Sequence, residues 1–161
     1  MNNFDTIYKE NYKRMFGVAL KMVNDKDVVC DILQDVFVYY FQKSQNGSTI
    51  NQPGSWLIRA TINKCIDYSK SRKKYTKIEG IDPISEGQDP IDRKQDQAII
   101  TLALSKLKPQ EKTLALLYSE GMSYKEIAEI SGIKLSSVGK MLARTIKKLD
   151  KILEKMNYEM Y

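Results

Sequence analysis

The C-terminal fold is decided by the stretch Ser123-Tyr124-Lys125-Glu126-Ile127-Ala128-Glu129-Ile130-Ser131-Gly132-Ile133-Lys134-Leu135-Ser136-Ser137-Val138. It opens with a capping box, in which the Ser123 hydroxyl accepts from the Glu126 amide and the Glu126 side chain reaches back to the Ser123 amide. The small Ala128 leaves room for a second helix to cross steeply, Gly132 supplies the positive φ of a turn, and Val138 packs back into the corner. This spacing predicts a helix-turn-helix of the DNA-binding form, with a plain pair of packed helices as the alternative.

The second of these two helices has a polar face opposite its apolar stripe. Hydroxyl groups and cations on a helix that fits the major groove contact phosphates and base edges. A solvated surface is the alternative for each side chain. The expected DNA-contacting residues are Ser136, Ser137, Lys140, Met141, Arg144 and Lys147.

Helical hydrophobic periodicity extends to both sides of this motif. It covers residues 4–23, residues 28–41 and a helix from about Ser55 to Lys73. Pro109 suits a first helical position, and Gly121 suits the left-handed residue after a helix. No strand pattern appears, so the sequence predicts an all-α fold.

Residues 77–94 separate two helical parts. The segment is net acidic, contains Gly80, Pro83, Gly87 and Pro90, and has little periodic hydrophobicity. Such composition is typical of a flexible linker. We therefore expect two small helical domains, residues 1–76 and residues 95–161, of which the second is the helix-turn-helix.

Composition restricts the possible functions. The 161 residues include 26 Lys and Arg against 20 Asp and Glu, and no His. The basic balance fits a polyanionic partner. Without His, and with only Cys30 and Cys65, a zinc site or an imidazole mechanism is not expected, and we expect no cofactor, no metal and no catalytic residue. No stretch is long and apolar enough to span a membrane, and the start carries no export signal, so we expect a cytoplasmic protein.

Two blocks of sequence, in this order, resemble the sigma-70 family of RNA polymerase sigma factors, of the extracytoplasmic-function type. The first block contains Asp31-Ile32-Leu33-Gln34-Asp35-Val36-Phe37 and Trp56-Leu57-Ile58-Arg59, followed by Asn63 and Asp67. The second contains Leu107-Lys108-Pro109 and Glu120-Gly121-Met122-Ser123-Tyr124-Lys125-Glu126-Ile127-Ala128. The resemblance covers nearly the whole chain.

The resemblance implies a polymerase contact in the first block. In the family, the helix that contains residues 31–37 docks on the clamp helices of RNA polymerase. Asp31, Gln34 and Asp35 lie away from the apolar stripe of that helix and are the expected polymerase-binding residues. The ordinary polar face of a helix is the alternative for each of them.

The resemblance also implies that the helix after residue 55 reads the minus-ten promoter element. The expected contacts there are Arg59, Asn63, Lys64, Asp67, Arg72 and Lys73. In the family the preceding loop, here about residues 48–55, holds a base flipped out of the duplex, which requires stacking and a cationic groove. For Trp56, and for at least two of Tyr39, Tyr40 and Phe41, core packing is the expected role.

The second block departs from the family at Lys134 and Gly139, and also at Thr145 and Ile146, which replace the family's usual Ala-Arg. Lys134 stands where a capping residue is common, which predicts that the recognition helix starts later, with Ser136 as its cap. Gly139 stands where a polar residue is common and loosens the helix by about 0.5–1 kcal/mol relative to Ala.

As a member of this family, the chain is expected to bind core RNA polymerase and promoter DNA. An anti-sigma factor is a further partner that the resemblance raises. Two alternatives remain: a stand-alone helix-turn-helix regulator that does not bind polymerase, and an enzyme that uses the motif for targeting. The block at residues 31–37 argues against the first, and the absence of His argues against the second.

Overall fold

The computed structural model describes residues 3–79 and 91–160, and every regular element in these ranges is an α-helix. This confirms the all-α prediction. In chain order the helices are α1 (Asn3–Val23), α2 (Lys26–Gln45), α3 (Pro53–Glu79), α4 (Ile91–Ser105), α5 (Pro109–Ser119), α6 (Tyr124–Ser131) and α7 (Leu135–Met160). The first residues of the predicted linker belong to α3 and its last residues belong to α4. Its centre, residues 80–90, lies outside the described residues.

The first three helices form a bundle, because each presents an apolar stripe to the other two. Met15 of α1, Leu33 of α2 and Leu57 of α3 are almost completely buried in its core. Asp25 caps α2, since its carboxylate accepts from the amides of Asp27 and Val28. Asn24, just before it, has a φ of 56° and turns the chain between α1 and α2.

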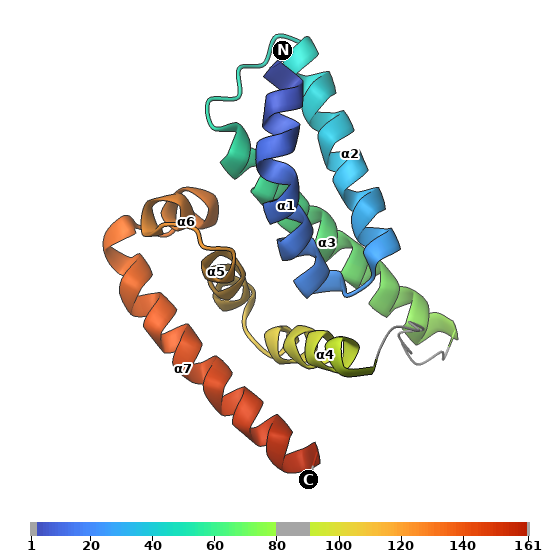
Figure 1. Ribbon diagram of the computed structural model, residues 1–161, viewed down its shortest axis with the longest axis vertical. Helices are drawn as coiled ribbons and strands as arrows, with labels where there is room; N and C mark the ends of the chain where they lie inside the picture. Colours follow the sequence, from blue (N-terminus) through green and yellow to red (C-terminus); the bar gives the residue numbers. More distant parts are fainter. Residues whose placement is uncertain (1–2, 80–90, 161) are drawn as a thin grey trace.

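The last four helices form a second unit. Pro109 starts α5 as expected, and the Glu111 side chain accepts from the Lys108 amide at 3.0 Å. Gly121 adopts a φ of 75° and turns the chain toward α6, also as expected. In Figure 1, α4, α5 and α6 lie along the side of the bundle that α1 and α3 form, and α7 runs along the outer edge.

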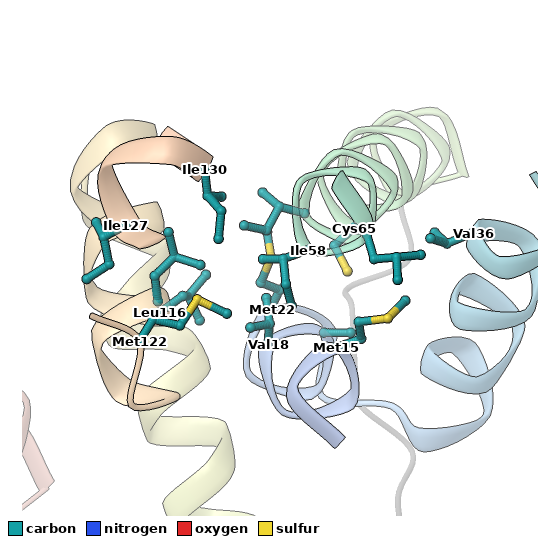
Figure 2. Close-up of a cluster of buried hydrophobic side chains, with 14 of the residues drawn as sticks. Met15, Val18, Met22, Val36, Ile58, Cys65, Leu116, Met122, Ile127 and Ile130 are labelled. Carbon is teal, nitrogen blue, oxygen red and sulfur yellow. The ribbon is translucent and has the colours of Figure 1, made fainter. Parts of the chain in front are cut away.

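The two units share one hydrophobic core. α1 contacts α4 and α5, and α3 contacts α6. Figure 2 shows the buried side chains of α1 and α3 facing those of the second unit, with Met22 and Ile58 opposite Leu116, Met122 and Ile130. The helix-turn-helix therefore packs directly against the three-helix bundle.

Candidate nucleic-acid interface

The turn between α6 and α7 has the geometry that the sequence predicts. The Ser123 hydroxyl accepts from the Glu126 amide at 3.1 Å, and the Glu126 carboxylate accepts from the Ser123 amide at 3.3 Å. Gly132 adopts a φ of 78°. Val138 is fully buried against this corner. These features form a helix-turn-helix in which α7 is the recognition helix.

The polar face of α7 is largely open to solvent. Ser136, Lys140, Arg144 and Lys147 are exposed, whereas Ser137 and Met141 are half-buried. The helix starts at Leu135, so Ser136 lies inside the first turn, and the prediction that it caps the helix was wrong. The reason is local, because the Ser137 amide already donates to the Lys134 carbonyl at 2.9 Å.

Two apolar side chains beside this face were missed from the sequence. Leu135 and Tyr124 are 55% and 48% exposed, next to the start of the recognition helix. The Tyr124 ring lies against α7 at Gly139, where an added Cβ would stand 3.4 Å from its Cε2 atom. A side chain at 139 would make an ordinary contact with this ring, so the packing does not explain the glycine. The only signal in the sequence was that neither side chain fits the apolar stripe of its helix.

A second set of polar side chains lies along α3. Arg59, Asn63, Lys64 and Asp67 are exposed. Arg72 is half-buried, with its Nη1 atom 3.5 Å from the Tyr68 hydroxyl, and the side chain of Lys73 lies outside the described residues. The residues at 59, 63 and 67 follow one another at one-turn intervals, so they share one face of the helix.

Arg59 is engaged by the second unit. Its Nε donates to the Ile130 carbonyl at 3.2 Å and its Nη2 to the Glu129 carbonyl at 2.5 Å. Both carbonyls belong to the last turn of α6, where backbone oxygens have no partner within the helix. The guanidinium therefore caps the C-terminal end of α6.

A cavity of about 280 Å³ opens between the loop before α3 and the first turn of that helix. It is lined by Lys43, Ser48, Thr49, Ile50, Asn51, Gln52, Ser55, Trp56 and Arg59. Its wall is mixed, because polar side chains and the cations Lys43 and Arg59 stand beside the apolar Ile50 and the large ring of Trp56. This volume is near the small end for ligand pockets, which suits a single flat group rather than a larger molecule.

An aromatic stack with a nearby cation stands beside this cavity. The rings of Tyr39 and Trp56 stack at a centroid distance of 5.8 Å, and Lys43 Nζ lies 5.8 Å from the centre of each. Tyr39 and Phe41 are 55% and 41% exposed, and of the three neighbouring aromatic residues only Tyr40 is buried. The expectation that two of the three serve the core was wrong. The reason is that residues 39 and 41 flank the buried stripe of α2 on either side.

The predicted polymerase-binding residues share the outer face of α2. Asp31, Gln34 and Asp35 are all exposed. Val38, which is not among the predicted contacts, is 50% exposed on the same face, one turn beyond Gln34 and Asp35. α2 lies on the side of the bundle away from α4–α7 (Figure 1), so the second unit does not cover this face.

The described part of the chain shows neither a metal site nor a membrane-spanning helix. Within residues 3–79 and 91–160, no group of three or more acidic or cysteine side chains is placed to hold a metal ion. None of the helices described combines the length and the apolar character needed to cross a bilayer.

The fold and these surfaces define an all-helical DNA-binding protein with a helix-turn-helix. The family described as Sigma-70 region 2 matches residues 7–75, and the family described as Sigma-70, region 4 matches residues 97–149, together more than half of the chain. The chain therefore belongs to the sigma-70 family, as an RNA polymerase sigma factor of the extracytoplasmic-function type.

Two curated relatives are sigma factors of the same type. The chain is 27% identical to the ECF RNA polymerase sigma factor SigE of Mycolicibacterium smegmatis, with 99% of this chain and 65% of SigE aligned. It is 26% identical to the ECF RNA polymerase sigma factor SigM of Bacillus subtilis, with 90% of this chain and 91% of SigM aligned. The chain thus spans just under two thirds of SigE and most of SigM.

Solved structures share the fold. CnrH in complex with the cytosolic domain of CnrY is similar with a TM-score of 0.68 and 20% identity, over 94% of this chain and 88% of that chain. The sigma factor RpoE in complex with the anti-sigma factor NepR from Bartonella quintana has a TM-score of 0.63 and 19% identity, over 96% of this chain and 98% of that chain.

Proposed function

We propose that this chain directs core RNA polymerase to promoters through two separate DNA contacts. Residues 95–161 bind the minus-thirty-five element, and residues 1–76 bind the polymerase clamp and the minus-ten element. The observation that carries the proposal is the open face of α7, where Ser136, Lys140 and Arg144 stand opposite the buried Val138 and present donors to a major groove.

The cavity before α3 is the proposed seat of one unpaired base of the minus-ten element. Trp56 offers a ring for stacking, and Lys43 and Arg59 offer cations for the adjoining phosphates. A base stacked on an aromatic ring gains about 1–3 kcal/mol, which offsets the cost of leaving the duplex. Arg59, Asn63, Lys64, Asp67, Arg72 and Lys73 are the proposed contacts along α3.

The outer face of α2 is the proposed docking site for polymerase. Asp31, Gln34, Asp35 and the exposed Val38 form one stripe along α2, so the surface combines acidic and polar side chains with an apolar one. Such a surface fits a helical partner that carries basic side chains, as the polymerase clamp would.

The chain performs no covalent step in this proposal. Strand opening is driven by binding energy gained from the flipped base and the phosphate contacts, and polymerase synthesises the RNA. Because its partner is bacterial RNA polymerase, we place the protein in the cytoplasm. An anti-sigma factor is a proposed regulator, since both structural relatives above are complexes with a second protein.

The test is transcription by core polymerase that lacks any sigma factor, supplied with this chain and DNA fragments of its own genome. We expect transcripts that start at defined promoters. Asp35→Lys should reduce them at least tenfold because it reverses a charge at the docking face, whereas the matched reversal Glu154→Lys on α7 should reduce them much less. DNA binding without polymerase association would instead identify a stand-alone regulator.

A further inference from the structure

The recognition helix α7 carries two parallel rows of side chains toward solvent, and only one of them is polar. Residues at intervals of four lie along one side of a helix. The polar row contains the proposed DNA contacts Ser136, Lys140 and Arg144. The other row lies one position earlier and contains Leu135, Gly139 and Ala143. We call this second row the apolar row, since none of its side chains carries a hydrogen-bond donor or acceptor.

The apolar row is open to water. Leu135 is 55% exposed, Ala143 is exposed and Gly139 is half-buried. The ring of Tyr124, 48% exposed at the start of α6, lies against Gly139 and extends the apolar surface on that side. Single exposed apolar side chains are ordinary, but a group of them on one surface marks a contact site.

Gly139 has no explanation within the chain. It lies inside a regular helix, where glycine is less favourable than any residue except proline. Its backbone is not in the left-handed region that favours glycine. An added Cβ would stand 3.4 Å from Cε2 of Tyr124, which is an ordinary contact. A glycine at such a position leaves room for another molecule to approach the helix closely.

The apolar row begins at the end of α7 that a helix-turn-helix directs at bases, because the first residues of the second helix contact base edges in the major groove. That groove exposes one apolar group, the C5-methyl group of thymine. We infer that the apolar row recognises thymine through this methyl group, which fits between Leu135 and Tyr124 above Gly139. The inference rests on the proposed function in one respect, that α7 enters the groove of the minus-thirty-five element.

The physical reason for this preference is the absence of polar groups from the row. A base that turns an amino or carbonyl group toward Leu135 loses water without gaining a hydrogen bond, which is unfavourable. A methyl group at the same place loses only its contact with water, which is favourable. The apolar row thus adds a preference for thymine to the hydrogen bonds that Lys140 and Arg144 offer beside it.

Selection from a library of random DNA duplexes provides the probe for the test. The full chain is used alone and bound to core RNA polymerase, and the enriched sequence supplies the duplex. Each thymine of that duplex is then replaced singly by deoxyuridine, which lacks only the C5-methyl group. We expect at least one replacement to weaken binding about fourfold, because burial of one such group changes an equilibrium by about that factor.

Leu135→Ala shows whether the apolar row makes this contact. The variant should bind the thymine duplex more weakly than the wild type, and it should bind the thymine and deoxyuridine duplexes equally. The ratio of these two affinities is the measurement, so a general loss of folding or binding cancels. Leu102→Ala, at a leucine of similar exposure (53%) on α4, is the matched control and should keep the wild-type ratio.

Gly139→Ala separates binding from stability. Alanine favours the helix and meets Tyr124 only in ordinary contact, so the midpoint of urea unfolding should rise. The same methyl group would stand between the helix and the base, so the affinity for the thymine duplex should fall at least as much as it does on removal of the thymine methyl group. An affinity equal to or higher than that of the wild type would overturn the close approach at Gly139.

The outcomes distinguish this inference from the proposed function. An enriched sequence in which every thymine tolerates deoxyuridine would overturn the inference and leave the minus-thirty-five role of α7 intact. A wild-type ratio in Leu135→Ala would also overturn it, and a loss of transcription in that variant would then assign the leucine to a protein partner. Enrichment by the chain alone, without polymerase association, would contradict only the proposed function. No enriched sequence in either form would overturn both.

Discussion

Arg144 projects from the exposed face of α7, one turn beyond Lys140, and is the cation of that face best suited to a bidentate contact. Its guanidinium is planar and fits the O6 and N7 atoms of a guanine edge. In the free chain nothing described here covers the side chain, in contrast to Arg59. The two arginines thus differ in their availability to DNA.

The first prediction concerns Arg144→Ala. It should weaken binding to a duplex with the minus-thirty-five element by about 1–3 kcal/mol, the usual value of a bidentate base contact. Fluorescence anisotropy on the specific duplex and on a scrambled one measures this. Arg144→Lys is the control, because a lysine retains the positive charge but lacks the planar pair of N–H donors. Equal losses on both duplexes would mean that the residue contacts a phosphate and not a base.

The second prediction concerns the cysteines. Cys65 is fully buried between α1 and α3, and burial raises the pKa of its thiol to about 12. A raised thiol pKa keeps the group protonated, and the thiolate is the reactive form. At pH 8 a thiol reagent should therefore react with the exposed Cys30 alone in the folded protein and with both after unfolding. Mass spectrometry of the native protein counts the modifications, and a doubly modified native protein would contradict the burial.

Site residues differ in how far sequence alone could place them. Ser136, Lys140 and Arg144 were predicted to face outward because a recognition helix must bury the stripe of Val138, and the structure has them exposed. Tyr124 and Leu135 were missed, since exposure of an apolar side chain follows from packing elsewhere in the chain. The engagement of Arg59 by α6 was also missed, because it joins residues about 70 positions apart.

At the scale of the elements, helix ends were the most predictable feature. Ser123, Pro109, Gly121 and Gly132 act through neighbours within a few residues, and all four lie where the local chemistry requires them. The end of α3 was predicted too early, at about Lys73. The helix continues to Glu79 because neither Gly nor Pro interrupts it before Gly80, and the basic residues after Lys73 are compatible with a helix.

The third prediction concerns the ion pair that joins α5 to α7. Lys148 Nζ lies 2.9 Å from Glu111 Oε1, and the hydrogen bond from Lys148, with that from the Lys108 amide, lowers the pKa of the Glu111 carboxyl. A lowered carboxyl pKa contributes stability above the ordinary pKa of about 4.3 and loses it as the pH falls through the folded value.

Glu111→Gln tests this pair. Above about pH 5 it should lower the free energy of unfolding by about 0.2–1 kcal/mol, and the difference from wild type should shrink in more acidic solution. Urea unfolding at a series of pH values measures it. Glu154→Gln, at an exposed position of α7, is the control and should have no such pH profile. A wild-type advantage that grew toward acidic pH would contradict the assignment.

At the scale of the whole molecule, one shared core joins the three-helix bundle to the unit that contains the helix-turn-helix. The periodicity of residues 4–23 predicted an amphipathic helix but did not indicate which neighbour covers Val18 and Met22. The structure shows that the neighbour is the second unit, about 100 positions along the chain (Figure 2). Each apolar contact between the units therefore contributes to the stability of both.

The last prediction follows from this shared core and uses Met22→Ala. The side chain is 5% exposed, so its loss should cost about 2–5 kcal/mol in the free chain. Part of that loss falls on the contact with the second unit, so the variant should also weaken the coupling between the two units. Ile32→Ala, in a buried position of α2 far from the second unit, is the control, since it should destabilise the bundle without weakening the interface. Thermal unfolding should show one transition in the wild type and in Ile32→Ala, and a broader or divided transition in Met22→Ala. A wild type that melted in two separate steps, one for each unit, would contradict the coupling.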